Sequence, residues 1–403
     1  MKNLHNAMID RGSSAAGEPE QTAFAIVDQC LAAAVQLGAS DVHIEPQADK
    51  LVFRLRVDGQ LKIWKELPID LHGQVMGRLK VMARLDISEK RRPQDGRFTQ
   101  STQAGVRDYR IAVAPMLEGE KAVIRVLHHD LSRLSIKNVG YSEHNLKIYQ
   151  EQLSKPHGLL LHCGPTGSGK TTALYAAINH IAKVSRNVQT IEDPVEGRLP
   201  GVNQAQVNSE IGVTFASFLR SYLRQDCDVI LVGEIRDPET AQLAVQAAMT
   251  GHLVLGTLHT NTAAGAVGRL CDMGVPPFFI AGAMIGTMSQ RLVRKLCKHC
   301  RQPVEVPAEI QRQCGLGPTH QLFQAVGCAQ CSKLGYRGRI GIQEIFAVTG
   351  AIRDAISGRA TEAELQALNA RNGLRNMFLD GVAKAVMGLT TLEEVYRNVV
   401  VDA

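Results

Sequence analysis

The sequence predicts an α/β protein with a parallel sheet covered by helices, a smaller α+β domain ahead of it, and a cysteine-bearing segment behind it. Three observations support this fold class. Short apolar runs alternate with helical segments between about residues 142 and 290, which is typical of a parallel sheet with helices on both faces. The first 130 residues mix helical patterns with alternating strand patterns. Two Cys-x-x-Cys pairs follow residue 296.

Length and composition indicate a globular protein of two or three domains. The chain has 403 residues, 45% apolar and 21% charged. A net charge of +6 with mixed signs and an aromatic content of 4% give no sign of a direct nucleic-acid partner. Residues 1–20 lack the apolar segment of a secretory signal and are expected to form a flexible arm. Nine cysteines without an export signal favour metal ligands or reduced thiols over a disulfide framework.

Residues 21–130 are predicted to form the small α+β domain. A helix is expected over 22–38, with Thr22 as its N-cap and Gly38 as its stop. The sequences DVHIEP and LVFRLRVDGQL alternate apolar and polar residues as half-buried strands do, and Val57–Gln60 is a hairpin signal. The remaining predicted elements are a helix near 70–85 and strands near 107–114 and 121–128. A linker is predicted at 131–142.

Residues 143–290 are predicted to form the central domain. Its strand-like runs are GLLLHCG, NVQTIED, DVILVGE and HLVLGTLH, and ligands of such sheets bind beyond the carboxyl ends of the strands. The stretch 273–291, which is uncharged up to Arg291, is short for a membrane span, which needs about 20 apolar residues. We expect it to form a buried core helix. Residues 291–340 carry the cysteine pairs, and residues 341–403 are predicted to be a helical subdomain in which threonines cap TEAELQAL and TTLEEVYRNVV.

The sequence GPTGSGKT matches the phosphate-loop pattern G-x-x-x-x-G-K-[ST]. It follows the apolar strand GLLLHC and precedes the helical pattern TALYAAINHI, which is the context that this motif requires. Backbone N–H groups are expected to surround phosphate, with Lys170 on the β/γ-phosphates and the Thr171 hydroxyl on Mg²⁺. The predicted nucleotide-binding residues are Gly164, Pro165, Thr166, Gly167, Ser168, Gly169, Lys170, Thr171 and Thr172.

Two acidic segments follow strand-like runs and are candidates for the chemistry. Glu234 ends DVILVGE, and Glu192, Asp193 and Glu196 lie in TIEDPVE. A parallel sheet brings such strand ends to one edge, where carboxylates can orient water or hold metal-bound water. We expect this of Glu234 and of at least one of the other three.

The run DVILVGE leaves a question open, because Gly233 stands where many nucleotide hydrolases have an aspartate. Asp228 lies at the other end of the run, and six strand residues span roughly 20 Å, so Asp228 and Glu234 cannot share one phosphate. The run is therefore a working catalytic strand, a degenerate one or an ordinary buried strand.

Two histidines flank the last strand-like run of the central domain. His252 and His259 are seven residues apart, so in a strand they point to opposite faces and at most one faces the γ-phosphate. His259, at the carboxyl end, is the favoured nucleotide sensor. His252 is the second candidate for nucleotide contact.

Two cysteine knuckles predict a zinc site. CKHC supplies Cys297 and Cys300, and CAQC supplies Cys328 and Cys331. Each knuckle places two thiolates on one side of a turn, and two knuckles complete a tetrahedral site. A redox role for one pair is the alternative.

The motifs together resemble the secretion and pilus-assembly ATPases, namely the E-type ATPase of type II secretion and the extension ATPase of type IV pili. The resemblance runs from about residue 22 to 400. It rests on GASDVHIEP, RRPQDGRF, GPTGSGKTTALY, IEDPVE, LRQDCDVILVGEIRD, GHLVLGTLHTN, QRLVRKLC and GYRGRIGI, in family order.

The resemblance implies roles that spacing alone does not supply. IEDPVE looks like the family's Asp box, GHLVLGTLHT like its His box and DVILVGEIRD like its Walker B strand, in which glycine before the glutamate is usual. The small domain is similar to the family's second N-terminal domain, whose arginines reach the nucleotide. Arg97 and Arg110 match those positions. The implied fold is a RecA-like P-loop NTPase core followed by a four-cysteine zinc module and C-terminal helices.

The resemblance also implies a function. It predicts a cytoplasmic Mg²⁺-dependent ATPase, peripheral at the inner face of the cytoplasmic membrane, that forms a ring and is expected to be a hexamer. ATP turnover is expected to drive an inner-membrane platform protein and accessory subunits that assemble pilin-like subunits. A retraction or DNA-uptake motor and a non-hydrolysing ATP-binding partner subunit are the alternatives.

The sequence departs from the family pattern at three points. Cys227 replaces a usual proline, and Thr262 stands where an acidic residue is usual. Many relatives also carry a further N-terminal domain. This chain begins almost directly at the second domain, so we expect a short form.

Overall fold

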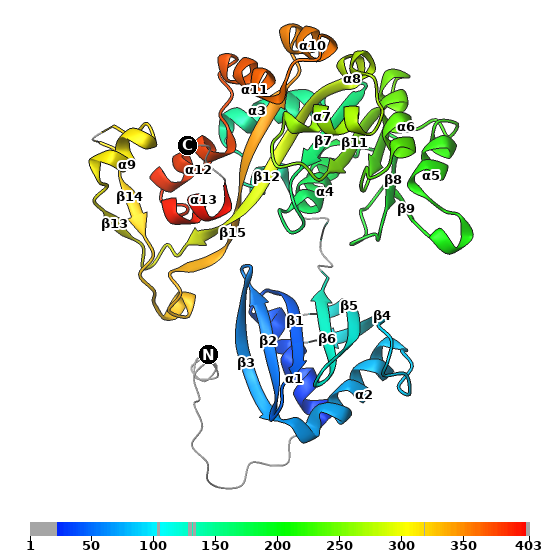
Figure 1. Ribbon diagram of the computed structural model, residues 1–403, viewed down its shortest axis with the longest axis vertical. Coiled ribbons are helices and arrows are strands. Elements are labelled where there is room, and N and C mark those ends of the chain that lie inside the picture. The colour runs from blue at the N-terminus through cyan, green and yellow to red at the C-terminus, as the bar shows by residue number, and fades with distance from the viewer. Residues whose placement is uncertain (1–21, 103–104, 128–130, 132–133, 318, 400–403) are drawn as a thin grey trace. The chain divides into compact units, whose positions relative to one another are not determined.

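The computed structural model describes residues 22–102, 105–127, 131, 134–317 and 319–399. They belong to two compact units, Met1–His129 and Asp130–Ala403 (Figure 1). The arm predicted for residues 1–20 lies outside the described residues. Within the described part of the chain, no helix is both long and apolar enough to cross a bilayer.

The first unit packs two helices against one face of an antiparallel sheet. Its elements are α1 (Ala23–Gln36), β1 (Ala39–Pro46), β2 (Lys50–Val57), β3 (Gln60–Pro68), η1 (Ile69–Leu71), α2 (His72–Ala83), β4 (Gln94–Thr102), β5 (Gly105–Met116) and β6 (Gly119–Val126). The strand order is β3-β2-β1-β6-β5-β4. Apolar residues of α1 and α2 share one core with the inward face of the sheet.

Local sequence signals in the first unit are confirmed. Thr22 caps α1 through a bond from the Ala25 N–H, and Val57 pairs with Gln60 across the predicted hairpin. Strand β4 was not predicted, because its residues include glycine, aspartate and other polar types that are rare in central strands. It lies at the edge of the sheet, where such residues are tolerated.

A buried ion pair joins α2 to β6 in the first unit. The Lys80 Nζ lies 2.6 Å from Oε1 of Glu120 and donates to the Glu89 carbonyl at 2.7 Å. Lys80 is 1% exposed and Glu120 is 6% exposed. Removing one partner of such a pair leaves an uncompensated buried charge.

Lys80→Met is therefore expected to lower the free energy of unfolding of the first unit by about 3 kcal/mol. Urea unfolding followed by fluorescence measures this unit selectively, because Trp64 is the single tryptophan of the chain. Lys50→Met, which breaks the exposed pair with Glu66 at 2.9 Å, is the control and should leave the transition unmoved. Equal midpoints for the two variants would contradict the prediction.

The second unit is larger and alternates strands with helices. Its first part contains η3 (Ile136–Asn138), α3 (Glu143–Leu153), β7 (Gly158–Cys163), α4 (Lys170–Ile181), β8 (Val188–Glu192), β9 (Asn203–Gln206), η4 (Ser209–Ile211), α5 (Phe215–Tyr222), β10 (Val229–Val232), α6 (Pro238–Met249), β11 (Leu253–Leu258), α7 (Gly265–Asp272), α8 (Pro277–Ala283) and β12 (Met284–Leu296). Its last part contains β13 (Gln302–Val304), α9 (Ala308–Gln313), β14 (Leu322–Gln324), η5 (Ala329–Cys331), β15 (Tyr336–Ala347), α10 (Gly350–Ser357), α11 (Glu362–Arg371), α12 (Met377–Val386) and α13 (Leu392–Asn398).

The predicted helix-covered sheet is confirmed, and it is mixed rather than purely parallel. Its order is β15-β12-β7-β11-β10-β8-β9, and only the β12–β15 pair is antiparallel. Alternate residues of the inner strands face two cores. One core includes α3 and α4, and the other includes α5, α6, α7, α8, α10 and α11. Burial on both faces explains why β7, β10 and β11 are mostly apolar runs.

The helix predicted over 273–291 is partly wrong. Pro277–Ala283 is helical, but Met284–Leu296 is strand β12, between β7 and β15. A strand buried on both faces has no alternation, so periodicity cannot distinguish it from a buried helix. Strand β15 was also unpredicted, because Tyr336–Ala347 spans the expected boundary between the cysteine segment and the C-terminal helices.

The C-terminal helices and their caps are confirmed. Thr361 forms a capping box with Glu364, and the Thr391 hydroxyl accepts from the Glu394 N–H. Part of the predicted linker packs on the second unit, where the Asn179 amide donates to the carbonyls of Leu131 and Leu134 at 2.7 and 3.1 Å. Figure 1 shows β12 and β15 as a long ribbon that leads from the sheet toward β13 and β14.

Candidate nucleotide site

The carboxyl ends of four adjacent strands form the candidate site. In the sheet order, β7 is followed by β11, β10 and β8, and all three pairings are parallel. The phosphate loop leaves β7, His259 follows β11, Glu234 follows β10, and β8 ends at Glu192. The topology therefore brings the predicted phosphate loop, histidine and carboxylates to one edge.

The backbone of the phosphate loop adopts conformations that suit glycine, and its lysine donates hydrogen bonds to carbonyl groups of the same loop. Gly164 and Gly169 have φ values of 139° and 88°, which side chains disfavour. The Lys170 Nζ donates to the Gly164 carbonyl at 2.6 Å and to the Pro165 carbonyl at 3.0 Å. Thr171 and Thr172 are exposed at the start of α4. The loop thus presents cationic and hydroxyl groups at a helix N-terminus, where phosphate binds well.

Each carboxylate oxygen of Glu234 lies beside a nitrogen of another side chain. Its Oε2 lies 2.5 Å from the Arg236 Nη2, and its Oε1 lies 2.9 Å from the His259 Nε2. Burial by itself would raise the pKa of Glu234, but the bond from Arg236 and the charges of Arg236, His259 and Lys170 lower it below its ordinary value. Glu234 is therefore an oriented carboxylate that stays ionised near neutral pH.

Lys170 and Glu234 influence each other electrostatically. Burial lowers the pKa of Lys170 below its usual range, and the negative charge of Glu234 acts in the opposite direction. The lysine of the phosphate loop and the acid at the end of β10 thus belong to one electrostatic site. Of the three interpretations of DVILVGE, the geometry favours the working strand.

Gly233 has a packing reason to be glycine. A Cβ at this position would lie 3.1 Å from the Glu192 Cα and 3.2 Å from the Ile191 carbonyl oxygen. These distances are tighter than most Cβ contacts, so an aspartate there would press on the end of β8. The glycine lets the ends of β8 and β10 approach closely.

The three Asp-box acids differ in their surroundings. Glu192 is buried, and it accepts from Tyr175, from the Thr190 hydroxyl at 2.6 Å and from the Gln204 amide at 3.1 Å. Asp193 is exposed, and its charge acts on Arg236. The Glu196 N–H donates to the Tyr175 hydroxyl at 3.2 Å. Glu192 is thus a buried anchor in this structure, whereas the negative charge of Asp193 acts on Arg236, the partner of Glu234.

Two flanking acids and one histidine bond to groups outside the site. His252 precedes β11, and its Nδ1 lies 3.0 Å from the Ala247 carbonyl at the end of α6. Its neighbour Leu253 pairs with Gly158, at the start of β7, so His252 lies a strand length from the phosphate loop of its own chain. Asp228 accepts from the Asn187 N–H at that same edge, and Asp237 caps α6.

Arg97 and Arg110 lie in the first unit and face each other across β4 and β5. Both side chains are exposed, and among the described residues neither forms an ion pair. Like charges directly opposite each other in an antiparallel pair are destabilising. The pair therefore concentrates positive charge on an exposed part of the β4–β5 ladder.

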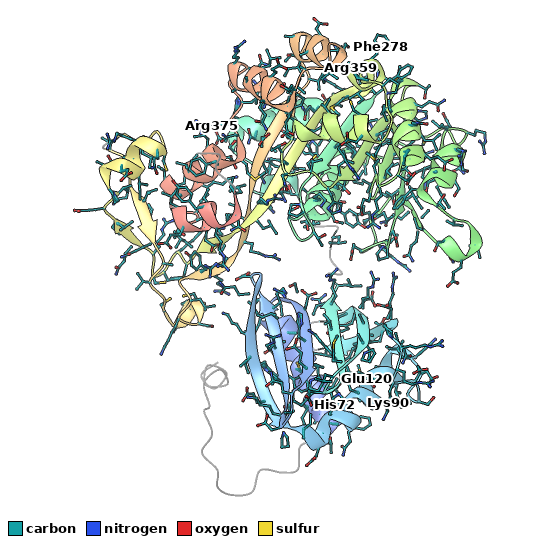
Figure 2. The ribbon with its side chains drawn as sticks, viewed as in Figure 1. His72, Lys90, Glu120, Phe278, Arg359 and Arg375 are labelled. Carbon is teal, nitrogen blue, oxygen red and sulfur yellow. The ribbon has the colours of Figure 1, made fainter. Side chains whose placement is uncertain are left out.

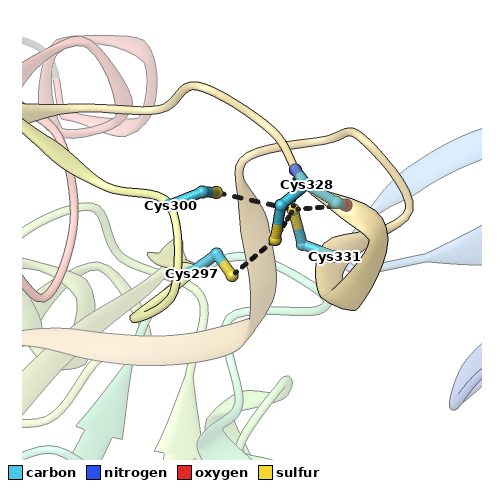
Figure 3. Close-up of side chains that lie close together, drawn as sticks. All are labelled: Cys297, Cys300, Cys328 and Cys331. Atoms are coloured by element: carbon cyan, nitrogen blue, oxygen red, sulfur yellow. Dashed lines mark hydrogen bonds between the residues drawn. The ribbon is translucent and has the colours of Figure 1, made fainter.

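The four cysteines of the two knuckles converge (Figure 3). All their sulfur atoms lie within 4.8 Å of one another. The separations are 3.9 Å for Cys297–Cys328, 3.7 Å for Cys300–Cys331 and 3.8 Å for Cys328–Cys331. A tetrahedron with metal–sulfur bonds of about 2.3 Å has edges of about 3.8 Å, so the cluster fits zinc. Convergence on one point fits a shared metal better than two separate redox pairs.

Three residues without a functional assignment from the sequence have defined contacts in the structure. Arg236 holds Glu234, and its place two residues after the acid was the available signal. The Thr262 hydroxyl accepts from the Gly265 N–H at 3.0 Å and donates to Glu362 at 2.5 Å. The buried Cys227 thiol donates to the Tyr222 carbonyl at 3.1 Å. Thr262 therefore joins α7 to α11, and Cys227 is a packing residue.

Two cavities lie away from the phosphate loop. One, of about 650 Å³, borders α2 in the first unit, where His72, Lys90 and Glu120 lie together (Figure 2). The other, of about 580 Å³, is lined by residues of α10, α11 and the turn between them, including Arg359. Neither contains a residue of the predicted nucleotide site.

Comparison with known proteins identifies a family that covers most of the chain. The model of the family "Type II/IV secretion system protein" matches residues 18–397. The "Type II secretion system protein E" of Pectobacterium carotovorum is 46% identical over 373 residues, which cover 92% of this chain and 74% of that protein. The "Type IV pilus assembly ATPase PilB" of Thermus thermophilus is 44% identical over 385 residues, which cover 94% of this chain and 43% of that protein.

A solved structure has the same overall fold. The crystal structure of "the Pilus Retraction Motor PilT and Bound ADP" is 28% identical and has a TM-score of 0.63, with 94% of this chain and 97% of that chain covered. The present chain spans less than half of the Thermus protein and about three quarters of the Pectobacterium protein.

Proposed function

Since this chain belongs to the Type II/IV secretion system protein family, we propose that it is an ATP-hydrolysing motor for the assembly of a type IV pilus or a type II secretion pseudopilus. Relatives at 44–46% identity are named for these two machines. The named retraction motor is 28% identical, so assembly is the better supported role than retraction or DNA uptake.

One observation carries the proposal of hydrolysis. Glu234, oriented by Arg236 and His259, shares an electrostatic site with Lys170 of the phosphate loop. A carboxylate in this position can orient a water molecule for attack on the γ-phosphate. A protein that only bound ATP would not require an acid held on both oxygens beside the phosphate lysine.

The other predicted residues have proposed roles in the same reaction. Lys170 leaves its two loop carbonyls to bind the β/γ-phosphates, and the exposed Thr171 hydroxyl would hold Mg²⁺, which neutralises phosphate charge when bound. His259 orients Glu234 and senses the γ-phosphate. Asp193 and Glu196 assist through solvent, with Glu192 anchoring the segment. The paired charges of Arg97 and Arg110 suit the charge that develops on the transferred phosphoryl group.

The proposed setting follows the family. The chain forms a ring, with a hexamer as the expected form, at the cytoplasmic face of the inner membrane. Turnover around the ring moves a platform protein and accessory subunits. The four-cysteine cluster holds Zn²⁺ as a structural module or a docking surface.

Purified chain is expected to release phosphate from ATP in the presence of Mg²⁺ and to lose this activity when EDTA is added. Lys170→Ala should weaken binding of an ATP analogue roughly 10- to 100-fold, because it removes a charge-assisted hydrogen bond to phosphate. Lys183→Ala, a lysine beyond the end of α4, is the control.

The same measurements distinguish a hydrolysing motor from a subunit that only binds ATP. Tight ATP binding without turnover, even with platform protein and lipid present, would instead indicate a non-hydrolysing partner subunit. Wild-type affinity in Lys170→Ala would exclude the proposed phosphate site.

A further inference from the structure

A series of buried side chains connects the phosphate loop to helix α12. It begins at Gln290 on β12, whose Nε2 donates to the Ser168 carbonyl at 2.8 Å. Gln290 is 2% exposed and Ser168 is 4% exposed. Neither the proposed chemistry nor the zinc module uses this contact.

The phosphate loop rests closely on Gln290. A Cβ at Gly164 would lie 2.7 Å from the Gln290 carbonyl oxygen, and a Cβ at Gly169 would lie 2.7 Å from its Nε2. The backbone of the loop therefore touches Gln290 on both sides of Ser168. A displacement of the Gln290 side chain has to displace the loop or break its hydrogen bond.

Gln343 continues the series on β15. It pairs with Gln290 in the antiparallel ladder, and its Nε2 donates to the Gln290 Oε1 at 3.3 Å. Its Oε1 accepts from the Lys384 Nζ at 2.9 Å, and its backbone N–H donates to Oδ2 of Asp380 at 2.9 Å. Both ends of this amide are thus engaged.

The series ends in a buried ion pair on α12. Lys384 lies 2.5 Å from Asp380, one helical turn away, and their side chains are 5% and 3% exposed. The Lys384 Nζ also donates to the Gly341 carbonyl at 2.8 Å. Buried charges are costly unless every partner is in place, so the pair holds α12 in one position on β15.

We propose that Gln290 and Gln343 are positioning residues through which the position of α12 sets the affinity of the phosphate loop for nucleoside di- and triphosphates. This inference rests on the proposed function. Each amide donates a hydrogen bond from its nitrogen and accepts one at its oxygen. If Lys384 shifts, Gln343 and Gln290 have to shift with it, or a buried polar group loses its hydrogen-bond partner. A partner that moves α12 would thereby change nucleotide binding.

Two variants test the series from its distal end. Gln343→Met removes the amide at similar length, and the double variant Asp380→Leu with Lys384→Met replaces the ion pair by apolar groups. Each is expected to weaken binding of a fluorescent ADP analogue about three- to tenfold and to raise KM for ATP similarly, with kcat changed less. A purely structural role would lower thermal stability without this split between KM and kcat.

A matched control lies on the neighbouring helix. Arg294, four residues beyond Gln290 on β12, pairs with Glu394 on α13 at 2.7 Å. Arg294→Met with Glu394→Leu should lower stability while leaving nucleotide affinity within twofold of wild type. If the double variant on α12 does not fold, Gln343→Met decides the question by itself.

The outcomes separate the inference from the function on which it rests. Wild-type protein that binds no nucleotide overturns the proposed function. Wild-type protein that binds, together with unchanged affinity in Gln343→Met, overturns the positioning role alone. Equal losses of affinity in the α12 and α13 variants overturn it as well, because general destabilisation would then account for both.

Discussion

Glu234→Gln is expected to lower kcat for ATP hydrolysis roughly 10²- to 10⁴-fold, the range that a positioned acid or base contributes. The amide keeps the size of the side chain but loses the negative charge that polarises water. The substitution alters the contacts with Arg236 and His259 and leaves the residues of the phosphate loop unchanged. The affinity for nucleotide should therefore change much less than kcat. Phosphate release at saturating ATP, with analogue binding measured in parallel, separates the two effects.

Glu239→Gln is the matched control for this substitution. Glu239 is an exposed carboxylate in the first turn of α6 that pairs with an exposed arginine, Arg220, and it should be dispensable. If Glu234→Gln kept kcat within twofold of wild type, Glu234 could not be the acid that orients water.

The lowered pKa of Glu234 also fixes the direction of its pH dependence. Its charge, and the stabilisation it gives the Arg236 and His259 contacts, are fully present above the ordinary value of 4.5. Both are lost as pH falls through the lower pKa of the folded protein. A loss of activity between pH 6 and 8 would therefore have to come from another group.

Cys328→Ser is expected to reduce zinc content from about one ion per chain to near zero after dialysis against a chelator. Structural zinc contributes about 10–16 kcal/mol in small four-ligand sites, so the region around β13, β14 and η5 should lose its protection from proteolysis. Metal analysis and limited proteolysis measure the two effects. We expect this loss because the Cys328 Sγ lies 3.9 Å from the Cys297 Sγ and 3.8 Å from the Cys331 Sγ, within the four-sulfur cluster.

Cys271→Ser provides the control for this second substitution. Cys271 is also partly buried but lies on α7, outside the cluster, and its replacement should leave one zinc bound. Full zinc retention in Cys328→Ser would contradict a four-thiolate site and would favour independent roles for the two knuckles.

The sequence by itself determined the local elements and the phosphate loop. Caps such as Thr22, Thr361 and Thr391 act over three or four residues, and the phosphate loop is one contiguous segment between a strand and a helix. Strands β7, β8, β10 and β11 were also predicted, because each is a short, largely strand-like run that ends on glycine or polar residues. These signals need no knowledge of distant parts of the chain.

The tertiary structure decided which distant side chains meet. Sheet order brings His259 from β11 and Glu234 from β10 together, and it separates His252 from the loop by the length of a strand. It also decided that Met284–Leu296 is a strand, because that segment fills the space between β7 and β15. Propensity and periodicity are properties of neighbouring residues, whereas these outcomes depend on the strand order of the whole sheet.

The contacts of Gln290 illustrate the same limit. Nothing in the local sequence marks this glutamine as a support of the phosphate loop, which lies 122 residues earlier in the chain. The contact is important because Gln290 is buried, and an amide that is excluded from water needs hydrogen-bond partners inside the protein. Sequence patterns therefore predicted which groups would contact nucleotide, and only the packed structure identified the side chains that hold these groups in place.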